Sequence, residues 1–155
     1  MVPNALTFRL VTGCRSTNRR ALGFLEGHME LDAEAGFEAL KSSGQSTMRA
    51  RFDYWLDEGV CDSYFHGFKS DSNWNYRRCF VFRWKTHRWY GFLCHPLPKS
   101  NPAFLVCVLC IHVYKNEKDT DRAELQRVYE WQTSMAAQAA ITQVFQEKGG
   151  EKWTN

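Results

Sequence analysis

The 155-residue chain has no run of about 18 or more apolar residues, which is the length that a membrane-spanning helix needs. Its first residues lack a basic segment followed by a long apolar stretch, so we expect no secretory signal. Internal repeats and low-complexity segments are also missing, which excludes solenoid, collagen-like and disordered proteins. These absences predict one compact cytoplasmic domain without a membrane partner.

Acidic residues are missing from positions 72–116, although the net charge of the whole chain is only +3. The same stretch holds many of the aromatic residues. Cations contact phosphates and aromatic rings stack on unpaired bases, so this composition favours a surface for RNA. The alternative is an aromatic sheet core with solvated basic edges. The cations of the stretch are Arg77, Arg78, Arg83, Lys85, Arg88, Lys99 and Lys115.

Cysteine is present in an even number, six, which would permit a disulfide framework. The apolar content of 44% and the expected cytoplasmic location argue against one. Cys107 and Cys110 form a C-x-x-C motif inside an apolar run. Residues three apart on a strand point to opposite faces, so we expect neither a zinc site nor another cofactor there.

Hydrophobic periodicity predicts an α+β domain over residues 1–148, followed by a frayed polar tail over 149–155. The expected order is β-α-α-β-β-β-α, with helices packed on a small, mostly antiparallel sheet. The strand over 103–114 is apolar throughout, which predicts a central position buried on both faces. We expect strands over 6–11, 78–84, 88–95 and 103–114; helices over 17–28, 33–40 (capped by Asp32), 47–57 (ended by Gly59) and 119–146; and loops over 60–76 and 96–102.

Several short segments in this order resemble the RelE/HigB superfamily of bacterial toxins, and in particular its phage-derived nuclease-like branch. The resemblance covers roughly residues 24–128, and the order and spacing of the segments carry it. The segments are Phe-Asp-Tyr-Trp-Leu-Asp-Glu-Gly at 52–59, Val-Phe-Arg-Trp at 81–84, Arg-Trp-Tyr-Gly-Phe-Leu at 88–93, Ile-His-Val-Tyr-Lys at 111–115 and the helix start at 118–125.

The resemblance implies a RelE-like fold and ribosome-dependent cleavage of mRNA without a metal. In that reaction a ribose 2′-OH attacks the adjacent phosphate, the developing charge is stabilised and the 5′ oxygen leaves with a proton. By position, Arg88 and Arg83 would stabilise the phosphate, Lys115 would stabilise charge or move protons, and His112 would act as acid or base. Residues expected to bind the RNA are Tyr90, Tyr114, Arg78, Lys85 and Lys118. The implied partners are mRNA, the ribosome and a cognate antitoxin protein.

Each candidate also has a structural interpretation. Arg88 would close the hairpin, His112 would be a satisfied core histidine, and Lys115 would mark the exit of a strand to solvent. Regular alternation predicts that His112 and Tyr114 share one face of their strand, and that Arg88 and Tyr90 share one face of theirs.

Three functions remain open at this point. The first is a toxin endoribonuclease, or mRNA interferase, paired with an antitoxin. The second is a non-catalytic, phage-derived module that binds RNA or a protein through the same basic aromatic sheet. The third is a structural protein whose basic residues are only solvated.

Overall fold

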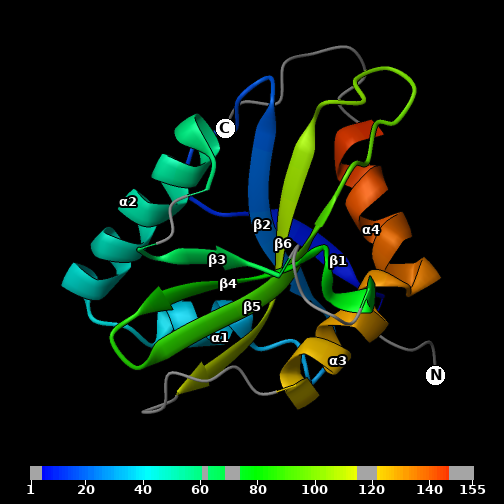
Figure 1. The fold of residues 1–155 in the computed structure, drawn as a ribbon. Coiled ribbons are helices and arrows are strands. Elements are labelled where there is room, and N and C mark those ends of the chain that lie inside the picture. The colour runs from blue at the N-terminus through cyan, green and yellow to red at the C-terminus, as the bar shows by residue number, and fades with distance from the viewer. Residues whose placement is uncertain (1–4, 61–62, 69–73, 115–121, 147–155) are drawn as a thin grey trace.

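The computed structural model describes residues 5–60, 63–68, 74–114 and 122–146. In this part of the chain six strands form one sheet, and four α-helices and a short 3-10 helix surround it (Figure 1). The predicted α+β class with a mostly antiparallel sheet is therefore confirmed. The elements are β1 (Thr7–Leu10), β2 (Arg20–Glu26), α1 (Ala33–Glu38), α2 (Ser42–Glu58), β3 (Phe65–Gly67), η1 (Trp74–Tyr76), β4 (Cys79–Trp84), β5 (His87–Cys94), β6 (Leu105–Tyr114), α3 (Arg122–Gln132) and α4 (Met135–Gln146).

Strand β6 lies inside the sheet, whose order is β1-β2-β6-β5-β4-β3. It pairs in parallel with β2 and antiparallel with β5, and the other neighbouring strands pair antiparallel. Every residue from Val106 to Ile111 is buried. The prediction of a central strand buried on both faces is confirmed.

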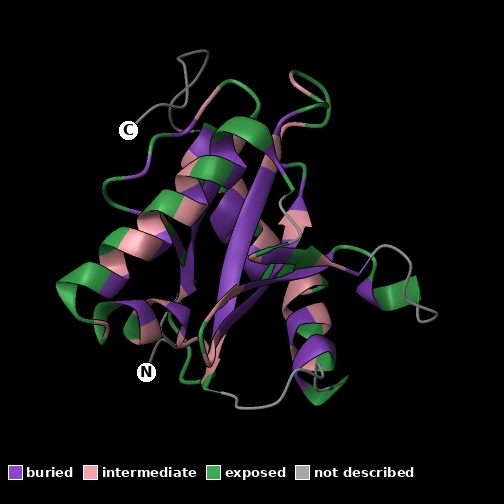
Figure 2. Cartoon of the chain, turned by 60° about the vertical axis from the view of Figure 1, so that its left-hand side comes forward, coloured by how far each residue is buried: buried purple, intermediate pink, exposed green. Residues whose placement is uncertain are grey.

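Helices cover both faces of the sheet, and Figure 2 shows the buried strands between them. On the α1–α2 face, Phe52 of α2 packs edge-on against Phe82 of β4, with ring centroids 5.1 Å apart. On the α3–α4 face, Phe145 of α4 packs against Phe104 and Phe8. Two aromatic-rich cores therefore hold the sheet, and burial of their apolar area is the main stabilising term.

A bulge interrupts β6 where it pairs with β5. Tyr90 lies opposite Ile111 and the next residue, Gly91, lies opposite Leu109, so Cys110 has no opposite residue. Cys110 and Ile111 consequently both point to the α3–α4 face, whereas Leu109 belongs to the α1–α2 core. An extra residue of this kind reverses the alternation of faces for everything that follows it.

The cysteines follow the expected pattern. Cys107 packs in the α1–α2 core and Cys110 in the α3–α4 core, so the two thiols of the C-x-x-C motif lie on opposite faces as predicted. The cysteines that the structure describes are buried and form no disulfide with one another: Cys14, Cys79, Cys94, Cys107 and Cys110. Cys61 lies outside the described residues.

The predicted helix over 17–28 is wrong, because this segment forms β2. The Thr17 hydroxyl accepts hydrogen bonds from the backbone N–H groups of Arg19 and Arg20, which makes a turn rather than a helix cap. The chain then enters the sheet between β1 and β6. Residues buried from both sides show no polar alternation, so their apolar pattern fits one face of a helix as well as it fits a buried strand.

Three further boundaries differ from the prediction. Helix α2 begins at Ser42 rather than at residue 47, so residues 42–44 do not interrupt it. The expected loop over 60–76 contains strand β3 and η1. The expected long helix is divided into α3 and α4, because Thr133 turns its hydroxyl back to the carbonyls of Tyr129 and Glu130 and Ser134 caps the next helix at Ala137. The end of α2 at Gly59 is confirmed, and the tail over 149–155 lies outside the described residues.

Gly91 gives a test of the bulge. A β-carbon at this position would stand 2.0 Å from the carbonyl oxygen of Val108, which is backbone and cannot move aside. We expect Gly91→Ala to lower the free energy of unfolding in urea by about 2–3 kcal/mol. Gly67→Ala is the control, because no atom lies within 4 Å of its added carbon, and it should change stability by less than about 0.5 kcal/mol. Equal stability of the two variants would contradict this packing.

Candidate functional site: the basic aromatic hairpin

The β4–β5 hairpin carries most of the predicted functional residues. Its register places Arg83 opposite Arg88 and Trp84 opposite His87. Successive residues of a strand point to opposite faces, so the hairpin presents one set of side chains to the α3–α4 face and another to the α1–α2 face.

Arg83, Arg88 and Tyr90 point to the α3–α4 face, together with the buried Val81. The predicted sharing of a face by Arg88 and Tyr90 is confirmed. Arg88 is only 9% exposed, and its Nη1 donates hydrogen bonds to the carbonyls of Lys85 and His87. The structural interpretation of Arg88 as the residue that closes the hairpin is therefore also correct.

The two guanidinium groups act on each other electrostatically. Burial lowers the pKa of Arg88, the nearby Arg83 lowers it further, and Tyr90 acts in the opposite direction. The Nε of Arg83 is buried and has no hydrogen-bond partner among the described residues. Like charges directly opposite each other on neighbouring strands are destabilising, so this pair is suited to an anion placed between them.

His112 lies on the other side of the sheet from Arg88. As predicted, it shares a face with Tyr114, and it packs against Trp89 on the α1–α2 face, with ring centroids 4.7 Å apart. Helix α1 covers it so closely that a β-carbon on Gly36 would fall within 2.2 Å of its ring. His112 and Arg88 therefore do not face one phosphate position, because His112 lies opposite Trp89, the neighbour of Arg88 on β5.

His87, which the sequence analysis did not select, joins His112 on this face. Its Nδ1 lies 2.9 Å from Nε2 of His112, and the ring centroids are 5.1 Å apart. The difference between these two lengths is close to two ring radii, so the nitrogens point at each other in one hydrogen bond. Alternation along one strand could not have found the pair, because it depends on the register that places His87 opposite Tyr114 and Trp89 opposite His112.

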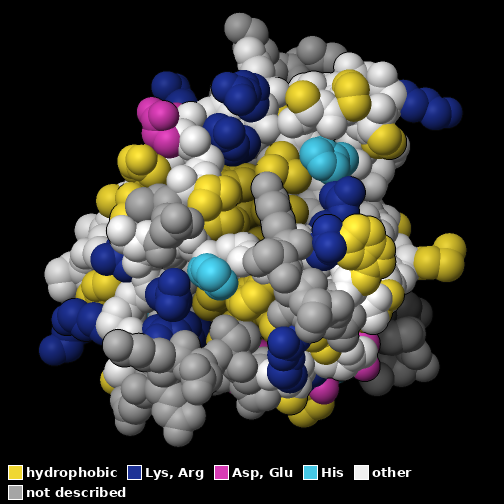
Figure 3. Space-filling view, viewed as in Figure 1, with side chains coloured by type: hydrophobic (Ala, Val, Ile, Leu, Met, Phe, Trp, Pro, Cys, Tyr) yellow, Lys and Arg dark blue, Asp and Glu magenta, His cyan; other side chains and the backbone are white. Residues whose placement is uncertain are grey.

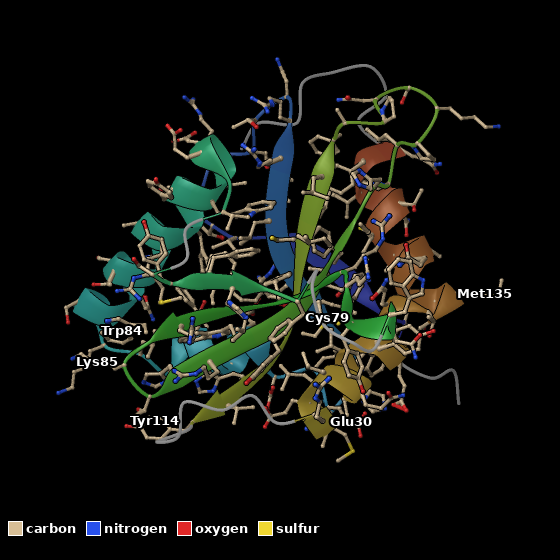
Figure 4. All side chains as sticks on the ribbon, in the orientation of Figure 1. Glu30, Cys79, Trp84, Lys85, Tyr114 and Met135 are labelled. Carbon is tan, nitrogen blue, oxygen red and sulfur yellow. The ribbon has the colours of Figure 1, made fainter. Side chains whose placement is uncertain are left out.

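Aromatic rings enclose the two imidazoles. Trp84 and Trp89 stack on His87, and Tyr114 meets it edge-on at 4.8 Å. Asp32, expected to cap α1 with its side chain, instead accepts a hydrogen bond from the backbone N–H of His112 at 2.8 Å. Figure 4 shows Trp84 and Lys85 at the turn and Tyr114 at the end of β6, all at the same end of the molecule.

The remaining predicted residues are spread along the hairpin. Lys85 lies in the turn with a positive φ of 54° and places its ammonium 4.9 Å from the Trp84 ring centre. Arg78 precedes β4 at the opposite end, where its carbonyl accepts from Leu93. Tyr90 is buried and Tyr114 is 67% exposed. Lys115 and Lys118 lie outside the described residues.

Figure 3 views the molecule from the side on which β3, β4 and β5 lie in front. Lys and Arg side chains are distributed over this side, while Asp and Glu appear at its upper left and lower right edges. A hollow with an apolar floor opens in its upper middle, with basic side chains above and beside it. It is lined by Arg20, Trp55, Glu58, Gly59, Val60, Phe65, His66, Gly67, Arg77, Cys79, Leu93 and Leu105.

A pair of carboxylates lies away from the hairpin. Arg9 forms ion pairs with both Glu26 of β2 and Glu34 of α1. Burial and the hydrogen bond with Glu34 raise the pKa of Glu26 to about 7. For Glu34, hydrogen bonds from Glu26 and Arg9 outweigh burial and lower the pKa. Stability from the protonated Glu26 is therefore lost as the pH rises through about 7.

No family model, curated protein or solved structure matches this chain. Within residues 5–60, 63–68, 74–114 and 122–146, no three His, Cys, Asp or Glu side chains gather as a metal site would require. None of the helices in those segments has both the length and the apolarity for crossing a bilayer. The function therefore has to be argued from the geometry of the hairpin and the hollow.

The imidazole pair predicts a pH dependence of stability. Burial and the nearby Lys85 lower the pKa of His87. Burial and the neighbouring His87 also lower the pKa of His112, although Asp32 acts to raise it. A histidine with a lowered folded-state pKa stabilises the fold above its unfolded pKa of about 6.5, and this contribution is lost as the pH falls further.

We therefore expect the free energy of unfolding in urea to fall more steeply from about pH 7 to pH 5 in the wild type than in His87→Gln. The contribution of Glu26 has the opposite sign but is common to both proteins, so it cancels in the difference. Identical slopes for the two proteins would show that folding does not lower the pKa of His87.

Proposed function

We propose that this chain binds single-stranded RNA through the β3–β5 half of its sheet. The observation that carries the proposal is the cross-strand pair of Arg83 and Arg88 on the α3–α4 face. Two guanidinium groups held opposite each other repel, and a phosphate oxygen between them offsets that repulsion with charge-assisted hydrogen bonds.

Exposed aromatic rings beside cations support RNA over other polyanions. Trp74 is 68% exposed, and the guanidinium carbon of Arg77 lies 3.2 Å from the centre of its ring. Tyr114 is similarly exposed next to the imidazole pair. Single strands are bound by rings on which unpaired bases stack and by cations that follow the backbone, and both kinds of group are present here.

A second candidate function is the mRNA cleavage implied by the RelE/HigB resemblance, with the ribosome and an antitoxin as partners. The observation that favours it is the phenol of Tyr90 within electrostatic reach of Arg88 on the face that carries Arg83. Arg83 and Arg88 would stabilise the phosphorane, and Tyr90 would transfer a proton. His112 faces away from this phosphate position, so we assign it no part in such a step.

RNA binding is tested by fluorescence anisotropy with a labelled single-stranded oligonucleotide over about 50–200 mM salt. We expect Arg83→Gln to weaken binding by about three- to tenfold and to reduce the salt slope by about one. Lys99→Gln removes the same charge from the loop at the opposite end of β5 and should change the affinity less than twofold, roughly. Equal effects of the two substitutions would show that binding depends only on net charge and not on the arginine pair. Absence of binding at physiological salt would show that the basic residues do not bind RNA and are only solvated.

Cleavage is tested by inducing the chain without any antitoxin and mapping the 5′ ends of cellular mRNA. We expect growth arrest with new 5′ ends for the wild type, and at least about a hundredfold slower cleavage for Tyr90→Phe, which removes only the phenolic oxygen from a buried ring. RNA affinity should be retained in that variant. Harmless expression of a protein that still binds RNA would leave binding as the function and reject the toxin.

A further inference from the structure

We propose that the apolar hollow between the end of α2 and strand β3 is a nucleotide subsite, which takes one base of the bound strand together with its phosphate. This inference rests on the proposed RNA binding and adds a place and a ligand class to it. Nothing in the sequence pointed to this position, because its lining comes from six separate segments.

The size and floor of the hollow fit a small planar group. Its volume is about 460 Å³, within the range of about 300–1,000 Å³ that is usual for small-molecule sites. Trp55, Phe65, Leu93 and Leu105 supply an apolar floor. Phe65 and Trp55 stack on each other with centroids 6.1 Å apart, so this floor is rigid rather than fluid.

Gly67 keeps the hollow open. Alternation along β3 places it on the same face as Phe65, and it lies opposite Phe80 in the sheet. No atom lies within 4 Å of the position that its β-carbon would occupy, and its backbone is not in the left-handed region. Any larger residue here would extend into the hollow, so the glycine provides room for a ligand and is not required by the backbone.

Cations stand at the rim in fixed positions. Nη1 of Arg20 donates to the carbonyls of Leu56 and Asp57 at the end of α2, and its guanidinium lies over the Trp55 ring. These bonds leave the rest of the guanidinium at the edge of the hollow. Gly59 gives it space, because a β-carbon there would stand 3.1 Å from Nη2.

Arg77 and His66 also line the hollow, and Glu58 is the carboxylate in the described lining. The charge of the lining is therefore mainly positive, and together with the apolar floor it favours an anion that carries an apolar, planar part. The exposed Trp74 under Arg77 extends the apolar surface from the rim. A nucleotide combines a flat base with a phosphate, whereas a long acyl chain would need a deeper cavity than this open hollow.

The hollow and the arginine pair are connected around the edge strand β3 of the sheet. Leu93, which lines the hollow, is five positions after Arg88 on β5, or roughly 17 Å at the usual rise per residue. It packs against the α1–α2 core, whereas Arg88 faces α3–α4. His66 also links them, since it lines the hollow and lies opposite Val81, two residues before Arg83. A single strand of RNA that occupies both places therefore passes around the edge strand β3, next to His66.

The test fills the hollow from Gly67. We expect the wild-type chain to bind 5′-mononucleotides, measured by isothermal titration calorimetry. Ribose 5-phosphate and inorganic phosphate, which lack the base, should bind at least about tenfold more weakly. Gly67→Phe should reduce mononucleotide affinity by about tenfold or more, while Gly67→Ala should stay within about threefold of wild type. Urea unfolding of each variant confirms that the fold is retained.

Arg77→Gln gives an independent measurement, because its side chain is exposed and its loss leaves the core intact. It should weaken mononucleotide binding by about threefold or more. The inference is overturned if Gly67→Phe binds mononucleotides like the wild type, or if oleate binds more tightly than the nucleotides and is displaced by the substitution. RNA binding that survives Gly67→Phe unchanged rejects the subsite alone, whereas a wild type that binds no RNA rejects the proposed function.

Discussion

The pairing of β6 with β2 on one side and β5 on the other is the constraint on which the rest of the structure depends. It joins the N-terminal hairpin to the later strands across one buried strand. Helix α1 is then fixed to the same strands by two hydrogen bonds, from the Trp89 indole to the carbonyl of Ala33 and from the His112 backbone to Asp32. The carbonyl of Ala33 and the backbone N–H of His112 thus each have a hydrogen-bond partner, which buried backbone groups require.

Several elements of the fold could be predicted from the sequence because their signals are local. The turn at Lys85, the helix end at Gly59 and the unbroken apolar run of β6 each define an element within a few residues. Strand β2 could not, because it is a strand only through its neighbours on both sides. Its run of Ala21 to Leu25 is buried everywhere and has no period that separates strand from helix.

The same distinction applies to the functional residues. Alternation correctly grouped Arg88 with Tyr90 and His112 with Tyr114, because each pair lies on one strand. It could not relate the two strands, since that depends on pairing register. His87 was not predicted as a site residue for this reason. The hollow was not predicted either, because its floor is assembled from residues that are distant in sequence.

The bulge at Cys110 does not decide which face of the sheet His112 occupies. Because β6 contains one residue more than β5 at this point, Cys110 and Ile111 face the same side of the sheet. Alternation then resumes, and His112 faces α1. Without Cys110, alternation would run regularly from Leu109 through Ile111 to His112, and His112 would still lie opposite Trp89 and face α1. The imidazole is therefore kept apart from the guanidinium groups by the pairing of His112 with Trp89, and the extra residue only adds the side chain of Cys110 to the α3–α4 core.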